Sequence, residues 1–77
     1  MIPMSELNPG ESAIVHQLSL SGSMRRRVQD LGLITGTRVE CLQRSPLGEP
    51  AAFLFRGAVI ALRSCDSVHI LVCKQVI

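Results

Sequence analysis

The sequence predicts a mainly β protein, a small barrel of five short strands with one short α-helix inserted at about residues 22–31. Five short segments rich in Val, Ile, Leu, Ala or Phe are separated by turns that contain Gly, Pro or Ser, a pattern typical of strands. One segment between them has helical spacing instead. The 77 residues predict a single domain, over residues 1–77, with a thin core. Closure of the sheet into a barrel would then protect its edges.

The first half of the chain predicts one strand and the helix. A strand is expected over residues 12–18, after the Pro-Gly turn at residues 9–10. The helix has apolar residues at i, i+4 and i+7, namely Met24, Val28 and Leu31. Ser21 or Ser23 suits its N-cap, and Gly32 suits a left-handed C-terminal cap. Because the helix has only about two turns, it must be held by packing.

The second half predicts four more strands. They are expected over residues 37–44, 51–56, 58–63 and 67–73. The turn "SPLGEP", residues 45–50, joins the first two and carries Leu47 near its tip. Five strands in this order suit an SH3-like barrel, in which the first and last strands pair. Residues 13–17 would then lie beside residues 68–72.

Composition disfavours catalysis and a membrane span. The sequence has no Gly-rich phosphate loop, no nucleophile elbow and no pair of carboxylates at helical spacing, so we expect a protein that is not an enzyme. The three Cys form no C-x-x-C pair and are expected to be free thiols of a reducing compartment. No apolar run reaches the roughly 18 residues of a membrane span, and we expect a cytoplasmic location.

Two histidines are the candidate metal ligands. If the first and last strands pair, His16 and His69 become possible cross-strand neighbours, and a Cys or Asp66 is a possible third ligand. Such ligands suit a borderline-soft ion such as Zn²⁺ or Fe²⁺. The alternative is that both histidines are simply exposed. No cofactor is required by this sequence, and a divalent transition metal is kept as a hypothesis.

Two features are candidate partner contacts. Arg25, Arg26 and Arg27 are consecutive, so their side chains spread around the helix at about 100° intervals instead of forming one stripe. They are either a solvated surface or a basic docking patch for an acidic partner or for the inner leaflet of a membrane. Leu47 either folds back on the barrel or stands out as an apolar anchor for a protein contact.

The chain resembles the FeoA family of small ferrous iron transport proteins. The resemblance rests on "LGLITG", "SPLGEP", and "VIALR" followed by "VHILV", with "LNPGE" near the start, and it covers residues 7–72. The family usually has Pro where this chain has Thr35. The resemblance implies an SH3-like barrel with an inserted helix and a partner, a membrane ferrous iron permease that carries a cytosolic GTPase domain. It also implies a place at the membrane through that partner only.

The first hypothesis for function is therefore a small accessory protein that binds and modulates such a permease. The second is a transition-metal-binding or metal-responsive module, related to the C-terminal domain of iron-dependent repressors. The third, a nucleic-acid-binding barrel, is disfavoured by a net charge of only +2 and by the absence of Tyr and Trp. A homodimer is a further possibility, through outward-facing Leu42, Leu54 and Leu71.

Overall fold

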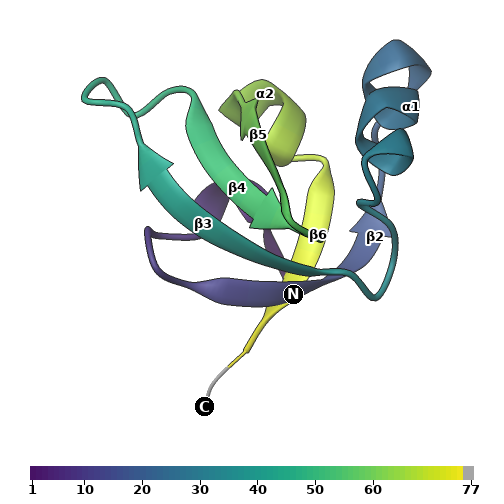
Figure 1. The fold of residues 1–77 in the computed structure, drawn as a ribbon, viewed down its shortest axis with the longest axis horizontal. Coiled ribbons are helices and arrows are strands. Elements are labelled where there is room, and N and C mark those ends of the chain that lie inside the picture. Colours follow the sequence, from purple (N-terminus) through teal and green to yellow (C-terminus); the bar gives the residue numbers. More distant parts are fainter. Residues whose placement is uncertain (76–77) are drawn as a thin grey trace.

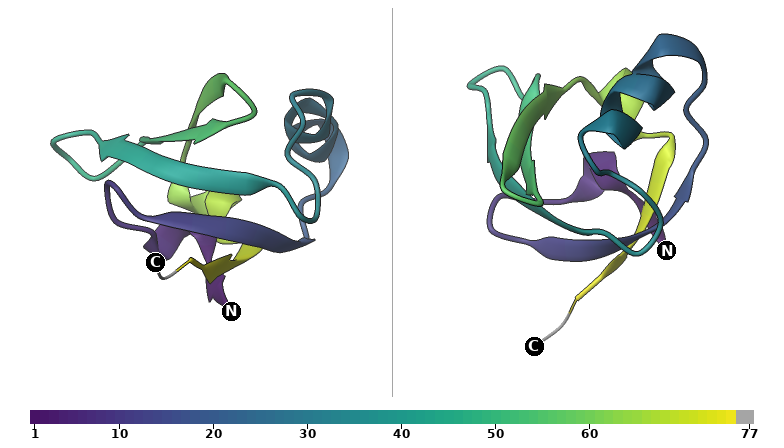
Figure 2. Two further views of the ribbon diagram at one scale, coloured as in Figure 1. Left: turned by 60° about the horizontal axis from the view of Figure 1, so that its bottom comes forward. Right: turned by 45° about the vertical axis from the view of Figure 1, so that its right-hand side comes forward.

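A computed structural model of the chain describes residues 1–75 and shows one antiparallel sheet that curls into a small barrel (Figures 1 and 2). The strands are β1 Ile2–Pro3, β2 Ser12–Leu18, β3 Arg38–Arg44, β4 Ala51–Phe55, β5 Ala58–Leu62 and β6 Ile70–Lys74. The helices are η1 Met4–Glu6, a 3₁₀ turn, then α1 Gly22–Asp30 and α2 Ser64–Ser67. The spatial order of the strands is β1-β6-β2-β3-β4-β5. The predicted domain ends at residue 77, and its last two residues lie outside the described ones.

The predicted fold class is confirmed, with two corrections. The described residues form six strands instead of five, because Ile2 and Pro3 add a short strand opposite Val72 and Leu71 of β6. The last strand begins at Ile70 and not at residue 67, because residues 64–67 form α2. The expected pairing of the first long strand with the last is confirmed, since β2 lies between β6 and β3.

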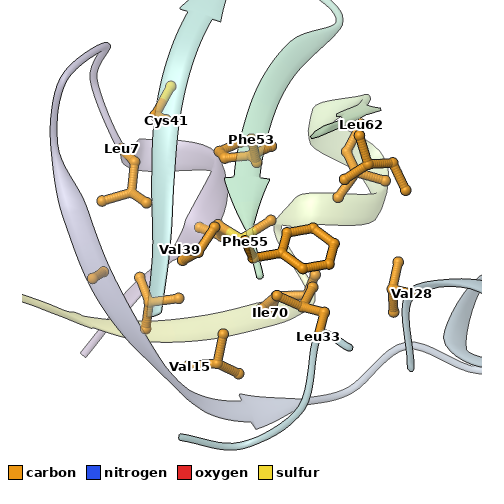
Figure 3. Close-up of a cluster of buried hydrophobic side chains, with 14 of the residues drawn as sticks. Leu7, Val15, Val28, Leu33, Val39, Cys41, Phe53, Phe55, Leu62 and Ile70 are labelled. Atoms are coloured by element: carbon orange, nitrogen blue, oxygen red, sulfur yellow. The ribbon is translucent and has the colours of Figure 1, made fainter. Parts of the chain in front are cut away.

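The core lies inside the barrel and is drawn from every strand except β1 (Figure 3). In β4 the inward residues alternate with partly exposed ones, as expected for a strand with one buried face. The largest buried side chains are Phe53, Phe55, Met4, Leu7, Leu33 and Ile70. With so few aromatic residues, the core depends on close packing of aliphatic side chains around the two Phe rings.

The helix α1 is attached to this core mainly at its C-terminal end. The N–H of Gly32 donates to the carbonyl of Gln29 at 2.9 Å, and the N–H of Leu33 donates to the carbonyl of Val28 at 2.9 Å. This pair of bonds is a Schellman motif, and it brings the fully buried side chains of Val28 and Leu33 into the core. The predicted Gly cap is confirmed. Leu31, expected on the inner stripe, is 41% exposed.

The N-terminal end of α1 is held differently from the prediction. Ser21 occupies the N-cap position, but its side chain makes no capping hydrogen bond. The Arg25 guanidinium instead donates from Nη1 to the carbonyls of Leu18, at 3.1 Å, and Leu20, at 3.2 Å. These bonds join the first turn of the helix to the end of β2.

We predict that Gly32→Ala destabilises the protein by at least about 1–2 kcal/mol, because Gly32 has φ +102° and a Cβ is disfavoured in that conformation. A Cβ there would also stand 2.8 Å from Cδ of Arg56. Urea unfolding measures the change. The Arg56→Ala background separates the two causes: a loss that persists in that background comes from the backbone conformation, whereas a loss that disappears comes from the contact.

Candidate protein-docking surfaces

A groove of about 700 Å³ lies between α1 and β5. Figure 1 shows both elements in the upper half of the molecule, with α1 standing to one side of the barrel. The residues that line the groove are Ser23, Arg26, Arg27, Asp30, Leu31, Val59, Ile60 and Ala61. One wall is therefore the face of α1 that carries Arg26 and Arg27, and the other is β5, the strand at the edge of the sheet.

The three predicted arginines separate into two roles. Arg25 is used within the molecule, where it holds the start of α1. Arg26 and Arg27 are exposed, and both line the groove. This division follows from the helical rotation of about 100° per residue, which turns successive side chains in different directions. Only two of the three cations are thus directed toward a space that a partner can enter.

The apolar part of the groove was not predicted. Val59 is 60% exposed and Leu31 is 41% exposed, and both border the groove beside the two arginines. Val59 belongs to a strand in which Ile60 and Leu62 are the buried residues, so alternation alone places it outside. The residues come from elements far apart in sequence, and no local pattern indicates that they meet.

Leu47 stands out from the molecule and is 94% exposed. The loop that carries it is tied at both ends: Gly48 N–H donates to the Ser45 carbonyl at 2.8 Å, and Ser45 N–H donates to the Pro50 carbonyl at 3.2 Å. A Glu49 carboxylate oxygen also accepts the backbone N–H of Ser64 at 2.7 Å and the Ser64 hydroxyl. An apolar side chain on a loop with this many internal bonds loses little entropy when it docks.

Glu49 links this loop to the start of α2. Ser64 is the first residue of α2, and its N–H has no partner within the helix, so the carboxylate acts as a cap supplied from another part of the chain. The hydrogen bonds from Ser64 lower the pKa of the Glu49 carboxyl from its ordinary value. The loop with Leu47 and the groove remain separate surfaces, since Figure 1 shows the β3–β4 loop on the opposite side from α1.

The two histidines are both exposed, but they are not cross-strand neighbours. The register pairs Val15 with Val72 and Gln17 with Leu71, and His16 occupies the irregularity between them. The His69 carbonyl accepts the N–H of Ser19 at 2.7 Å, and Ser19 lies three residues after His16, just past the end of β2. At about 3.3 Å per residue, His16 and His69 are therefore displaced from each other by roughly 10 Å along the strands. The expected neighbour relation is wrong, because the register, which the bulge at His16 shifts by one residue, places His69 beside Ser19.

Residues 1–75 contain no group of three or more His, Cys, Asp or Glu side chains placed to hold a metal ion. Metal binding through His16 and His69 stays a prediction, and it now requires either separate sites or ligands from another molecule. The three cysteines are free, as expected: Cys65 and Cys73 are exposed, and Cys41 is buried. Burial raises the pKa of the Cys41 thiol. No helix within residues 1–75 has the length and apolar character of a membrane span.

Comparison with known proteins identifies similar chains. The model of the FeoA domain family matches residues 2–74. The Fe(2+) transport protein A/Fe(2+) transporter FeoB fusion protein of Porphyromonas gingivalis is 28% identical over 67 residues, which are 87% of this chain. This chain spans only 8% of the length of that fusion protein.

Solved structures of FeoA proteins share the fold. The FeoA protein of Chlorobium tepidum superposes with a TM-score of 0.92 at 31% identity, over 97% of this chain and 71% of that one. The FeoA of Stenotrophomonas maltophilia, solved in complex with zinc and described as a prokaryotic SH3 domain protein, has a TM-score of 0.78 at 27% identity. That match covers 95% of this chain and 91% of the Stenotrophomonas chain.

We predict that Arg25→Ala lowers the free energy of unfolding by about 1 kcal/mol, because two carbonyls lose a charged donor. Arg26→Ala is the matched control, with the same change of side chain one residue away, and should change stability by less than about 0.5 kcal/mol. Urea unfolding measures both. Equal losses would contradict the division of roles among the arginines.

We predict that the Glu49 contribution to stability depends on pH. The carboxyl has a lowered pKa in the folded state, so its contribution is fully present above the ordinary value of 4.5 and is lost as the pH falls through the lowered pKa. Glu49→Gln should therefore be less stable than the wild type at pH 7, and the difference should shrink at pH 3. Urea unfolding at both values measures it, with Glu6→Gln as an exposed control. A difference independent of pH would contradict the role of the charge.

Proposed function

This chain belongs to the FeoA domain family, and we propose that it is an accessory module of bacterial ferrous iron transport that binds an Fe(2+) transporter of the FeoB type. The contact is made with the cytosolic GTP-binding domain of the transporter. The chain itself carries out no reaction. It modulates the activity or the assembly of the transporter through binding.

The fusion protein of Porphyromonas gingivalis is the observation that carries this proposal. In that protein a domain similar to this chain is joined to an Fe(2+) transporter in one polypeptide. Joining two modules replaces an encounter in solution by an intramolecular one, with an effective concentration that reaches the millimolar range for short linkers. A fusion of this kind favours the interpretation that the two modules act together. The separate chain would make the same contact by ordinary association.

The surfaces of the chain support a docking role. A preorganised loop presents Leu47 to solvent, and a groove with exposed Val59 and Leu31 is bordered by Arg26 and Arg27. A few buried side chains, with Arg among the most frequent types, carry most of the binding energy in protein interfaces. Both surfaces combine an apolar contact with a fixed backbone, which lowers the entropy lost on association.

Modulation requires that the chain bind one state of the transporter more tightly than another. A ligand shifts a conformational equilibrium only by its differential affinity for the two states. Coupling free energies of about 1–3 kcal/mol are typical, which corresponds to a change of about 5- to 150-fold in affinity. The coupling is reciprocal, so the nucleotide bound to the GTPase domain would change the affinity for this chain by the same factor.

We predict that the chain binds the isolated cytosolic domain of the transporter with a Kd that differs between the GDP-bound and GTP-analogue-bound forms. Calorimetry measures the two values. Leu47→Ser and the Arg26→Ala/Arg27→Ala double variant should each weaken binding by about tenfold or more, as expected for interface anchors.

Lys74→Ala is the control for charge, because Lys74 lies on β6 and its only ion pair in the described chain is with Glu11 at 3.0 Å on the surface. Binding of the wild type that is undetectable in both nucleotide states would overturn the proposed function. Alternatively, the wild type binds tightly, but Lys74→Ala and the arginine changes weaken binding equally. That result would support the proposed function and would show that the groove is not the binding site.

A further inference from the structure

We propose that the groove between α1 and β5 receives an extended, acidic segment of a partner protein, which pairs with β5 as an added strand. The proposal rests on the proposed function only for the identity of the partner: in the proposed assembly, the segment belongs to the transporter. The mode of binding is argued from the edge of the sheet, the apolar residues of the groove and the charges around it.

The backbone of β5 is open on one side. β5 is the last strand of the sheet and pairs only with β4. Arg56 and Gly57, with φ +49° and +77°, form the two-residue turn between them. In such a hairpin the flanking residues Phe55 and Ala58 share the first pair of hydrogen bonds, and the pattern then alternates. The N–H and C=O groups of Val59 and Ala61 are thus directed away from β4, toward the groove.

No other part of residues 1–75 takes up these outward groups of Val59 and Ala61. The two edges of the sheet differ sharply in this respect. β1 has only two residues, and one of them is Pro3, which has no N–H to donate. β5 has five residues, with neither Pro nor a charged residue among them. Proteins normally protect open edges with such residues, so an apolar, unprotected edge of this length is suited to strand addition.

The side chains of the groove suit an extended segment. In an added strand, alternate side chains would face the outer surface of β5, where Val59 is 60% exposed. Leu31, at the end of α1, adds a second exposed apolar contact on the opposite wall. A volume of about 700 Å³ accommodates several residues of such a segment. Apolar side chains at every second position of the segment would lie beside Val59 on one face of the added strand, which leaves the alternate positions on its other face.

The charges around the groove select an acidic segment. Arg26 and Arg27 line it, Arg56 lies in the turn before β5, and Arg63 immediately follows β5. Asp30 is the only acidic residue in the lining. Arginine forms paired hydrogen bonds with carboxylates, so Glu or Asp side chains on the segment would find partners on the α1 wall.

The same charges disfavour a second copy of this chain as the occupant. Two β5 edges paired with each other would bring two sets of these arginines together, and like charges placed opposite one another repel. A homodimer through β5 is therefore an outcome that the experiment has to exclude and not the occupant proposed here.

The test uses the full chain and a synthetic probe, the blocked peptide Glu-Val-Glu-Val-Glu-Val-Glu, with Lys-Val-Lys-Val-Lys-Val-Lys as its charge-reversed control. Amide hydrogen exchange and chemical shifts are followed by NMR, and affinity is followed by the same titration. We expect the acidic peptide to protect the Val59 and Ala61 amides and to shift those of Arg26 and Arg27. The basic peptide should leave all four unchanged.

Val59→Pro is the main variant, because it removes the outward N–H and leaves the hydrogen bonds to β4 in place. Val59→Thr is the matched control, since it keeps the N–H and a similar shape. We expect Val59→Pro to weaken peptide binding by at least about tenfold, and Val59→Thr by less than about threefold. If Val59→Pro fails to fold, the double variant Arg26→Glu/Arg27→Glu decides, with the expectation that it abolishes binding of the acidic peptide and gains binding of the basic one.

Shifts confined to the β3–β4 loop, or equal binding by all variants, would overturn the proposal. Protection of Val59 and Ala61 without peptide, at concentrations where the mass is that of a dimer, would assign the groove to a second copy instead. Titration of the same variants of this chain with the cytosolic domain of the transporter separates the two proposals. Binding of that domain unaffected by Val59→Pro removes this inference alone, whereas peptide binding without any binding of the domain removes the proposed function alone.

Discussion

The position of α1 depends on the short loop, residues 31–37, that fastens its C-terminal end to the barrel. A helix of nine residues is not stable alone, so its orientation has to come from tertiary contacts. The buried Thr37 hydroxyl donates to the Gly32 carbonyl at 3.0 Å and accepts the Ile34 N–H at 3.1 Å. The same loop joins β2, where Gly36 N–H donates to the Val15 carbonyl at 2.8 Å and Val15 N–H donates to the Thr37 carbonyl at 2.9 Å. The groove between α1 and β5 keeps its width because this loop is fixed at both ends.

The loop that carries Leu47 is also fixed by hydrogen bonds, although different groups make them. Its conformation is fixed by bonds within the turn and by the Glu49 carboxylate at the start of α2. Both surfaces are therefore held in place before any partner arrives, and a partner that binds them loses less conformational entropy. Because they lie on opposite sides of the barrel, a partner that uses both has to reach around it or supply two segments. Two linked contacts of modest strength then reinforce each other through effective concentration.

The strands and the helix were predictable because their signals are local. Turn residues and alternation place β2 and α1, and the Gly32 cap is visible as a residue type. Most of the errors involve partners distant in the chain. The first turn of α2 is capped by Glu49, fifteen residues earlier in the sequence. β1 exists only by pairing with β6. The bulge at His16 shifts the register between β2 and β6, which alternation cannot reveal. The groove was missed for the same reason, since Arg26 and Val59 line one groove only in the folded barrel.

The anchoring of α1 also decides what the open strand edge can do. An exposed apolar edge such as β5 is ordinarily a hazard, because it pairs with any other open edge, including that of an identical chain. Here the helix stands beside that edge and carries Arg26 and Arg27, so a whole sheet approaching edge to edge meets both a steric wall and like charge. A single extended segment with carboxylates meets neither obstacle. Selectivity of this kind depends on a repulsive element as much as on an attractive one. The hydrogen bonds that fix the end of the helix thereby turn an unprotected edge into a surface that favours one class of partner.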